Sequence, residues 1–252
     1  MTERDQALNA LVELSRRLGD PSADAAILGE GNTSVRIGER EMLVKASGAV
    51  LGDAEAADFV PLDLGEAERL IGDPDAGDTE VSELFGRVAE AHGRRPSVEA
   101  LLHAVVYAST DARVVAHSHP TDVNALLCSE RAELLIEGGL FPDQIVVLGA
   151  TPLLVDYIDP GIRLAREVAL LLAEHIERHG ESPRVIYLRN HGMFALGASA
   201  AEVLGITRMA QKCARVLIGA AAVGGVQFMP AEEVVRIDSR PDEQFRRGLL
   251  SN

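Results

Sequence analysis

Apolar residues recur at helical spacing in several stretches of the chain. Within residues 3–18, leucine and valine side chains repeat every three or four positions, which places them on one face of a helix. A Gly-Asp-Pro sequence directly after this stretch ends the pattern. The same reasoning predicts helices over residues 97–108, 163–178 and 199–222, the last of them rich in alanine and glycine.

Short apolar runs bounded by turn residues predict strands. The runs lie at residues 33–37, 42–45, 113–117, 144–148, 153–155, 184–188 and 193–196. Two pairs of neighbouring runs are joined by short polar turns, which favours antiparallel pairing. The intervening helices would cover the faces of a sheet. We therefore predict one α/β domain over residues 1–252, with a largely antiparallel sheet flanked by helices.

Composition and charge narrow the functional classes. The chain has 252 residues, of which 47% are apolar and 25% charged, as in a globular protein. Its 39 Asp and Glu residues outnumber 24 Lys and Arg residues, and the net charge of −15 repels phosphate backbones. With 4% aromatic residues and no Trp, the chain also has few side chains on which bases could stack. We expect no nucleic-acid partner, although a local anion site is compatible with this charge.

Neither the start of the chain nor its apolar runs predict a membrane protein. The opening sequence Met-Thr-Glu-Arg-Asp-Gln has no basic-then-apolar signal pattern. The longest apolar runs, at residues 168–173 and 219–226, are far shorter than the ~20 residues that a span needs. We expect no membrane contact and a cytoplasmic protein in which Cys128 and Cys213 are buried, reduced thiols.

Histidines in two segments could bind a metal ion. His117 and His119 are two positions apart at the end of a predicted strand, so their side chains point to the same face. By itself this spacing is a weak motif, and ordinary sheet or loop histidines are the alternative. His191, in a turn between two apolar strands, could supply the third nitrogen of a zinc site with an open position. Alternatively, His191 is an ordinary turn residue, since its Asn and Gly neighbours suit turn geometry.

A carboxylate accompanies the predicted helix that starts near residue 97. Ser97 suits the N-cap, and Glu99 falls in the first turn, where the helix dipole favours a negative charge. Alternatively, Glu99 transfers protons beside a metal ion. His103, one turn further on, could be a fourth ligand, but a packing histidine is the better interpretation.

Two further segments could form binding sites. Residues 29–34 lack the dinucleotide fingerprint, because the glycine spacing is wrong and a strand follows, but they could form a nest of N–H groups for an anion. Residues 45–48 on the next strand could lie beside them, and a purely structural hairpin is the alternative. His175 and His179 are spaced as in zinc proteases but lack the Glu that follows the first His, so we expect no metal there.

Taken together and in this order, these segments resemble the class II aldolase/adducin family. The motifs are Gly31-Asn32-Thr33-Ser34, Lys45-Ala46-Ser47-Gly48, Pro96-Ser97-Val98-Glu99, His117-Ser118-His119-Pro120 and Asn190-His191-Gly192. The resemblance implies a three-layer α/β/α fold with a central, mainly antiparallel sheet. It also implies a divalent ion, Zn²⁺ or another such as Mn²⁺ or Co²⁺, on His117, His119 and His191.

The resemblance assigns roles to other residues as well. Glu99 corresponds to the catalytic acid/base of the family aldolases. Residues that fall where such enzymes hold the substrate phosphate are Asn32, Ser47, Gly48 and Ser97. Sugar-phosphate members are often homotetramers with the site between subunits. This chain departs from the pattern at Val98, where many members carry a second hydroxyl, and none of its tyrosines matches the catalytic tyrosine of some members.

The expected function is that of a metal-dependent lyase. The resemblance implies an aldolase that cleaves a ketose 1-phosphate or related sugar into a dihydroxyacetone phosphate-type product and an aldehyde. Alternatives on the same scaffold are an epimerase, a decarboxylase or a dehydratase of a sugar phosphate or sugar acid. A non-catalytic, adducin-like module is a further alternative, against which the complete set of three histidines argues.

Overall fold

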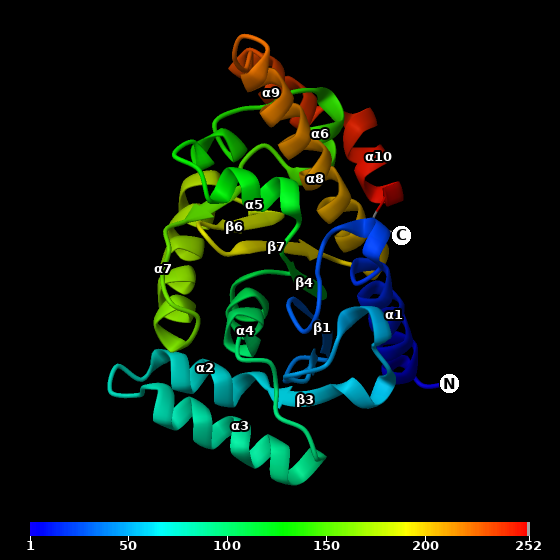
Figure 1. The fold of residues 1–252 in the computed structure, drawn as a ribbon, viewed down its shortest axis with the longest axis vertical. Coiled ribbons are helices and arrows are strands. Elements are labelled where there is room, and N and C mark those ends of the chain that lie inside the picture. Colours follow the sequence, from blue (N-terminus) through cyan, green and yellow to red (C-terminus); the bar gives the residue numbers. More distant parts are fainter. Residues whose placement is uncertain (251–252) are drawn as a thin grey trace.

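A mixed β-sheet runs through the middle of the molecule, and the computed structural model describes residues 1–250 (Figure 1). The strands follow the spatial order β3-β2-β1-β4-β7-β6-β5. Their bounds are β1 (Asn32–Ile37), β2 (Glu41–Lys45), β3 (Phe59–Asp63), β4 (Val114–Ser118), β5 (Leu153–Val155), β6 (Val185–Leu188) and β7 (Gly192–Gly197). Neighbouring strands pair in antiparallel fashion, apart from the parallel pair β5 and β6. The prediction of a mainly antiparallel sheet is confirmed.

Helices cover both faces of this sheet. Their bounds are α1 (Glu3–Leu18), α2 (Leu64–Gly72), α3 (Asp78–His92), α4 (Ala100–Ser109), α5 (Thr121–Leu127), α6 (Pro142–Leu148), α7 (Ile162–His179), α8 (Ala200–Ala222), α9 (Ala231–Ser239) and α10 (Pro241–Leu250). One apolar core joins the sheet to α1, α5 and α8, and a second joins it to α2, α3, α4 and α7. The fold is therefore the expected three-layer α/β/α arrangement.

Alternation along β4 shows how the sequence divides between these two cores. Val114 and Ala116 face the core beneath α1 and α8, whereas Val115 faces the core beneath α4. By the same period of two, His117 points to the side of α4, where its ring stacks on Phe194 at 4.4 Å between centroids. The strand thus delivers a histidine to the layer that also holds Glu99.

The parallel pair β5 and β6 follows from the chain that connects them. Helix α7 lies between the two strands in sequence, and such a crossover returns the chain in the same direction. The helix ends at His179 and is capped by Gly180, whose φ of +76° is the left-handed conformation that glycine adopts most easily. By contrast, the antiparallel pair β6 and β7 needs only the short turn that carries His191.

Several expectations about elements are corrected by the structure. Residues 144–148 are not a strand but the end of α6, which begins with Pro142 and stops before Gly149. A short apolar run fits a buried strand and a buried helix equally well, and the proline at the first helical position decides for the helix. Helix α4 starts at Ala100, so Glu99 rather than Ser97 is its N-cap residue. Cys213 is buried as expected, but Cys128 is exposed.

Other elements were not predicted at all, namely β3, α2, α3, α5, α9 and α10. The single domain expected over residues 1–252 stays a prediction, and residues 251 and 252 lie outside the described residues. Among the helices of the described chain, none combines the length and the apolar character that crossing a membrane requires.

Candidate active site

Three histidines meet at one end of the central strands. His117 is the fourth residue of β4, His119 follows that strand, and His191 lies in the turn between β6 and β7. Because β4 pairs with β7, the turn comes to rest beside the end of β4. The three ring centroids are 4.6, 4.9 and 5.4 Å apart. One nitrogen of each ring lies within 4.8 Å of the others, so the three could hold one cation.

The turn that carries His191 is fixed by its neighbours. Asn190 has a φ of +53°, a left-handed conformation that Asn tolerates better than most residues. The His191 amide donates to the Leu188 carbonyl at 3.2 Å, and the Asn124 side chain donates to the His191 carbonyl at 3.0 Å. A Cβ atom on Gly192 would lie 2.5 Å from His119 Cδ2, so only glycine fits at that position.

The hydrogen-bond partners of the Nδ1 atoms determine which form of His117 and His119 faces the centre of the histidine cluster. His117 Nδ1 lies 3.1 Å from the Met193 carbonyl, and His119 Nδ1 lies 3.0 Å from Glu30 Oε2. Both partners accept hydrogen bonds, so in the neutral rings Nδ1 carries the proton and Nε2 a lone pair. The two Nε2 atoms nevertheless face each other at 2.8 Å. A cation between them removes this repulsion, so the donor set fits a divalent metal.

Burial also favours the neutral, metal-binding form of the His119 imidazole. Desolvation and the neighbouring His117 lower its pKa, while Glu30 acts in the opposite direction. The neutral imidazole is the form that binds metal ions. Glu30 was missed by the sequence analysis, because an isolated acidic residue in a loop carries no signal of its own.

Glu99 reaches the histidine cluster from the N-terminus of α4. Its Oε1 lies 2.8 Å from His191 Nε2, and its Oε2 lies 3.2 Å from His117 Nε2. Burial raises the pKa of Glu99, but His117 and His191 more than reverse this and hold the pKa well below its usual range. Within the described chain, Oε1 is buried without a hydrogen bond. A buried, anionic oxygen beside imidazole nitrogens is a second indication that a cation belongs here.

Asn32 and His103 stand behind Glu99. The Asn32 amide nitrogen donates to Glu99 Oε2 at 2.8 Å, and the Asn32 amide oxygen contacts His103 Nε2. The other nitrogen of His103 lies 2.6 Å from Ser34 Oγ. Both nitrogens of His103 are thus engaged away from the cluster, which argues against the fourth-ligand alternative.

The segment of residues 45–48 lies beside residues 95–97, which lead directly to Glu99. Ala46 and Pro96 form a β-bridge, the Ser47 amide donates to the Arg95 carbonyl, and the Ser97 amide donates to the Lys45 carbonyl. These contacts place Ser47, Gly48 and Ser97 in two adjoining backbone segments. Gly48 has a φ of +79°, which suits a tight turn.

Lys45 is a site neighbour that the sequence analysis did not single out. Its side chain is almost completely buried, and its ammonium group contacts the carbonyls of Gly29 and Ala49. Burial lowers the pKa of Lys45 to about 8, although the charges of Asp58 and Glu99 oppose this effect. A lysine is rarely buried without a functional or electrostatic reason, and its position before the Ser47-Gly48 pair is the signal that could have identified it.

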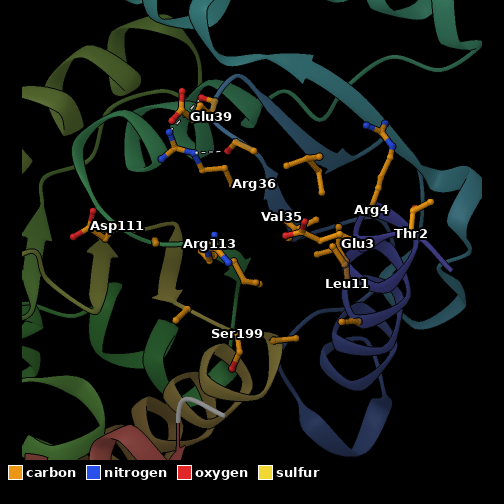
Figure 2. A pocket seen from close by; sticks show the side chains of 18 residues that line it. Thr2, Glu3, Arg4, Leu11, Val35, Arg36, Glu39, Asp111, Arg113 and Ser199 are labelled. Carbon is orange, nitrogen blue, oxygen red and sulfur yellow. Dashed lines mark hydrogen bonds between the residues drawn. The ribbon is translucent and has the colours of Figure 1, made fainter.

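A separate cavity of about 800 Å³ lies at the opposite end of β1 and β4 (Figure 2). Val35, Arg36 and Arg113 line its sheet side, and the other side includes Leu11 of α1 and Ser199, the N-cap residue of α8. The cavity contains none of the predicted site residues. His175 and His179 form another pair, with ring centroids 4.5 Å apart, but they do not belong to the three-histidine cluster.

The chain is similar to several known proteins. The chain is 32% identical to a methylthioribulose-1-phosphate dehydratase of Geobacillus kaustophilus over 126 residues, which are 46% of this chain and 55% of that protein. It is 29% identical to a 3,4-dihydroxyphthalate decarboxylase of Terrabacter over 216 residues, which are 82% and 79% of the two chains. It spans 23%, 27% and 55% of the length of three curated relatives.

A solved structure shares the fold, and a family match identifies the family. The structure of an L-fuculose 1-phosphate aldolase superimposes with a TM-score of 0.70 and 21% identity, covering 98% of each chain. Residues 9–218 match the family described as Class II Aldolase and Adducin N-terminal domain. This match covers most of the chain, including the three histidines, Glu99 and the segments around Asn32 and Ser47. The chain therefore belongs to the class II aldolase/adducin family.

Proposed function

We propose that the protein is a metal-dependent lyase that cleaves a carbon–carbon bond in a ketose 1-phosphate or a related sugar, yielding a dihydroxyacetone phosphate-type product and an aldehyde. The observation that carries this proposal is the contact of the Glu99 carboxylate with two members of the three-histidine cluster. A proton-transfer group and a cation site then share one substrate position. Similarity to a dehydratase, a decarboxylase and, in fold, an aldolase supports a lyase of this family.

Three imidazoles would hold the cation and leave a position for substrate. When bound there, Zn²⁺, Mn²⁺ or Co²⁺ supplies a Lewis acid that polarises the substrate carbonyl. The neutral state of His119, favoured by burial, makes its nitrogen available to the ion. The hydrogen bonds of His117 and His119 to Met193 and Glu30 keep both rings oriented.

Glu99 would move the proton. In the direction of synthesis, its carboxylate removes a proton from the carbon that becomes the nucleophile. In the direction of cleavage, the protonated Glu99 returns that proton to the same carbon. Its contacts with His117 and His191 support this role, because they hold the carboxylate beside the proposed cation.

The substrate phosphate would be held by Ser47, Gly48 and Ser97, and by Asn32 through the amide hydrogen that Glu99 does not take. The two backbone segments that carry the last three residues adjoin each other, as a shared anion site requires. Lys45 adds a positive charge next to these segments. Val98 cannot donate a hydrogen bond, so the pocket would have one hydroxyl fewer than in many sugar-phosphate aldolases.

A second candidate function is dehydration of a sugar phosphate. It is favoured by two methylthioribulose-1-phosphate dehydratase relatives, which are 32% identical over 126 residues and 25% identical over 207 residues. Removal of water next to a carbonyl also needs a Lewis acid and a proton-transfer group, so the same residues would serve.

The site would be completed by further copies of the chain, in a homotetramer. Large apolar side chains are exposed directly beside site residues, namely Ile27, Leu28 and Val98. Such side chains are typical of surfaces that another subunit covers. Light scattering after size-exclusion chromatography tests this, and a monomer at micromolar concentration would contradict it.

The decisive experiment is a product analysis. Metal-stripped protein is reloaded with Zn²⁺, Mn²⁺ or Co²⁺ and incubated with ketose 1-phosphates, methylthioribulose 1-phosphate and sugar acids. Release of an aldehyde together with dihydroxyacetone phosphate supports the aldolase, loss of water supports the dehydratase, and loss of CO₂ supports a decarboxylase. A chain that binds no divalent ion and converts nothing would instead be a non-catalytic module.

Glu99→Gln is the matched variant for this experiment. The amide keeps the shape of the side chain but cannot act as a base, so turnover is expected to fall by about 10²- to 10⁴-fold. Metal content should stay unchanged, because the three histidines remain. Unchanged turnover would remove Glu99 from the mechanism.

A further inference from the structure

A continuous chain of hydrogen bonds leads from Glu99 into the interior. The Tyr107 hydroxyl lies 2.7 Å from Ser34 Oγ, and Ser34 Oγ lies 2.6 Å from His103 Nδ1. His103 Nε2 contacts the Asn32 amide oxygen, and the Asn32 amide nitrogen lies 2.8 Å from Glu99 Oε2. Five side chains are thus connected, and the Glu99 carboxylate at the end of the series contacts the rings of His117 and His191.

The spacing of these residues explains why they meet. Glu99, His103 and Tyr107 are four positions apart, so they follow one face of α4 and its N-cap. Asn32 and Ser34 are two positions apart on β1 and point to the same side of the sheet. The helix face and the strand face lie against each other, and the polar side chains alternate between the two elements along the chain of bonds.

These five side chains are buried, with Glu99 the most accessible at 7%. Burying polar groups costs free energy unless their hydrogen bonds are made. An apolar side chain such as Leu would fill the position of His103 without this requirement. The set therefore calls for an explanation beyond packing.

Each bond in the chain has only one possible direction. The Glu99 carboxylate can only accept, so Asn32 donates through its amide nitrogen and presents its oxygen to His103. That oxygen can only accept, so His103 carries its proton on Nε2 and accepts at Nδ1. Ser34 must then donate to His103 and accept from Tyr107. Burial lowers the pKa of His103 to about 3, so the imidazole is neutral. Burial also raises the pKa of Tyr107, so its hydroxyl keeps its proton.

We propose that His103 is a positioning residue for Glu99: its neutral Nε2–H form locks the Asn32 amide in the orientation that donates to Glu99 Oε2. With the amide reversed, the Asn32 oxygen would face the carboxylate and repel it from the cluster. Held correctly, Oε2 is anchored and Oε1 stays directed toward His191 and the substrate position. The expected effect on turnover rests on the proposed function, whereas the fixed orientation of the Asn32 amide is independent of it.

The form of His103 can be measured without any substrate. Two-bond ¹H–¹⁵N spectra of ¹⁵N-histidine-labelled protein distinguish the two neutral forms and the cation, and the His103 signals are identified by their loss in His103→Leu. We expect the pattern of a ring protonated at Nε2 alone. A ring protonated at Nδ1, or at both nitrogens, would overturn the proposal whatever reaction the enzyme catalyses.

The kinetic test compares two variants of the same residue. His103→Leu removes the donor, and kcat should fall by about 10- to 100-fold, the range seen when a hydrogen-bond partner of a metal ligand is lost. KM and metal content should stay nearly unchanged. His103→Gln places an amide N–H where Nε2 was and should restore most of the rate. An unchanged kcat in His103→Leu, or an equal loss in both folded variants, would refute the positioning role.

His175→Leu is the matched control. His175 is also buried, but it lies on α7 and contacts Thr151 and His179 rather than the cluster. Its kcat should equal that of the unaltered enzyme, and circular dichroism of all three variants monitors folding. If the product analysis identifies a dehydratase instead of an aldolase, the His103 variants are compared with the dehydratase substrate. Failure of the proposed aldolase function is therefore distinguishable from failure of the positioning role of His103.

Discussion

Replacing Gly192 by alanine should disrupt the metal site with a single methyl group. Gly192 begins β7 directly after His191, at the place where the turn approaches the end of β4. An added Cβ would lie 2.5 Å from His119 Cδ2, 2.6 Å from the Ser118 carbonyl oxygen and 3.2 Å from His117 Cε1. Two of these three neighbours belong to the rings that face the proposed cation.

The size of the effect follows from these distances. Carbon atoms in contact are normally about 3.5–4.0 Å apart, so the methyl group overlaps the His119 ring by about 1 Å. Ser118 cannot retreat, because its carbonyl belongs to the backbone of β4, which pairs with β7. The ring must move, or the strands must separate at a cost of about 1–3 kcal/mol. A displaced ligand should weaken metal binding by at least about 10-fold, as disturbing even the partners of ligands does.

The assay is metal content after purification, followed by competition against a chelator of known affinity. Gly205→Ala is the matched control, because Gly205 lies within α8 and a Cβ there would meet no atom within 4 Å. That variant should keep its metal and gain about 0.5–1 kcal/mol of helix stability. A Gly192→Ala protein with unaltered metal affinity would show that the histidine cluster is not where the ion binds.

Three further predictions concern other residues. His117→Ala should lose bound divalent ion and activity together, as metal analysis shows, and full activity without metal would contradict the mechanism. Lys45→Met isolates the buried ammonium group: folded Lys45 has a pKa of about 8, against about 10.4 unfolded, so between these values the unfolded chain binds more protons. The stability of the unaltered protein relative to Lys45→Met should therefore rise from about pH 8 to about pH 10 in urea titrations, and a constant or shrinking difference would disprove the burial effect. Val98→Ser supplies the missing hydroxyl beside Ser97 and should lower KM for a phosphorylated substrate by about 2- to 10-fold, with no change for its unphosphorylated analogue.

The parts of the fold that the sequence predicted are those with a clear local pattern. Helices α1, α7 and α8 have long amphipathic faces, and β4 and β7 have short apolar runs with turn residues at their ends. These patterns also place His117, His119 and His191 at strand ends, where antiparallel pairing brings them together. The grouping of Glu99 with them came from the family resemblance, because nothing local distinguishes it from a carboxylate in a first helical turn.

The remaining features depend on contacts between layers, which a local pattern does not reveal. Residues 144–148 have side chains suited to a strand, and only the preceding proline and the packing of α6 against α8 favour the helix. Lys45 breaks the rule that lysine stays at the surface, because its ammonium group finds carbonyl partners from other segments. His103 was expected to pack or to bind metal, and its link to Glu99 passes through Asn32, a residue on another element.

His117 and His191 stand about 74 positions apart along the chain and become neighbours only when β4 and β7 have paired. The three-histidine site is therefore incomplete until the long segment between His117 and His191 has closed. A metal ion can contribute little to the folding steps that precede this closure. Both apolar cores are complete without it. Protein stripped by a chelator should thus remain native in shape and regain its ion on simple addition of the metal, without passing through denaturation, unlike small zinc domains that collapse when their metal is withdrawn.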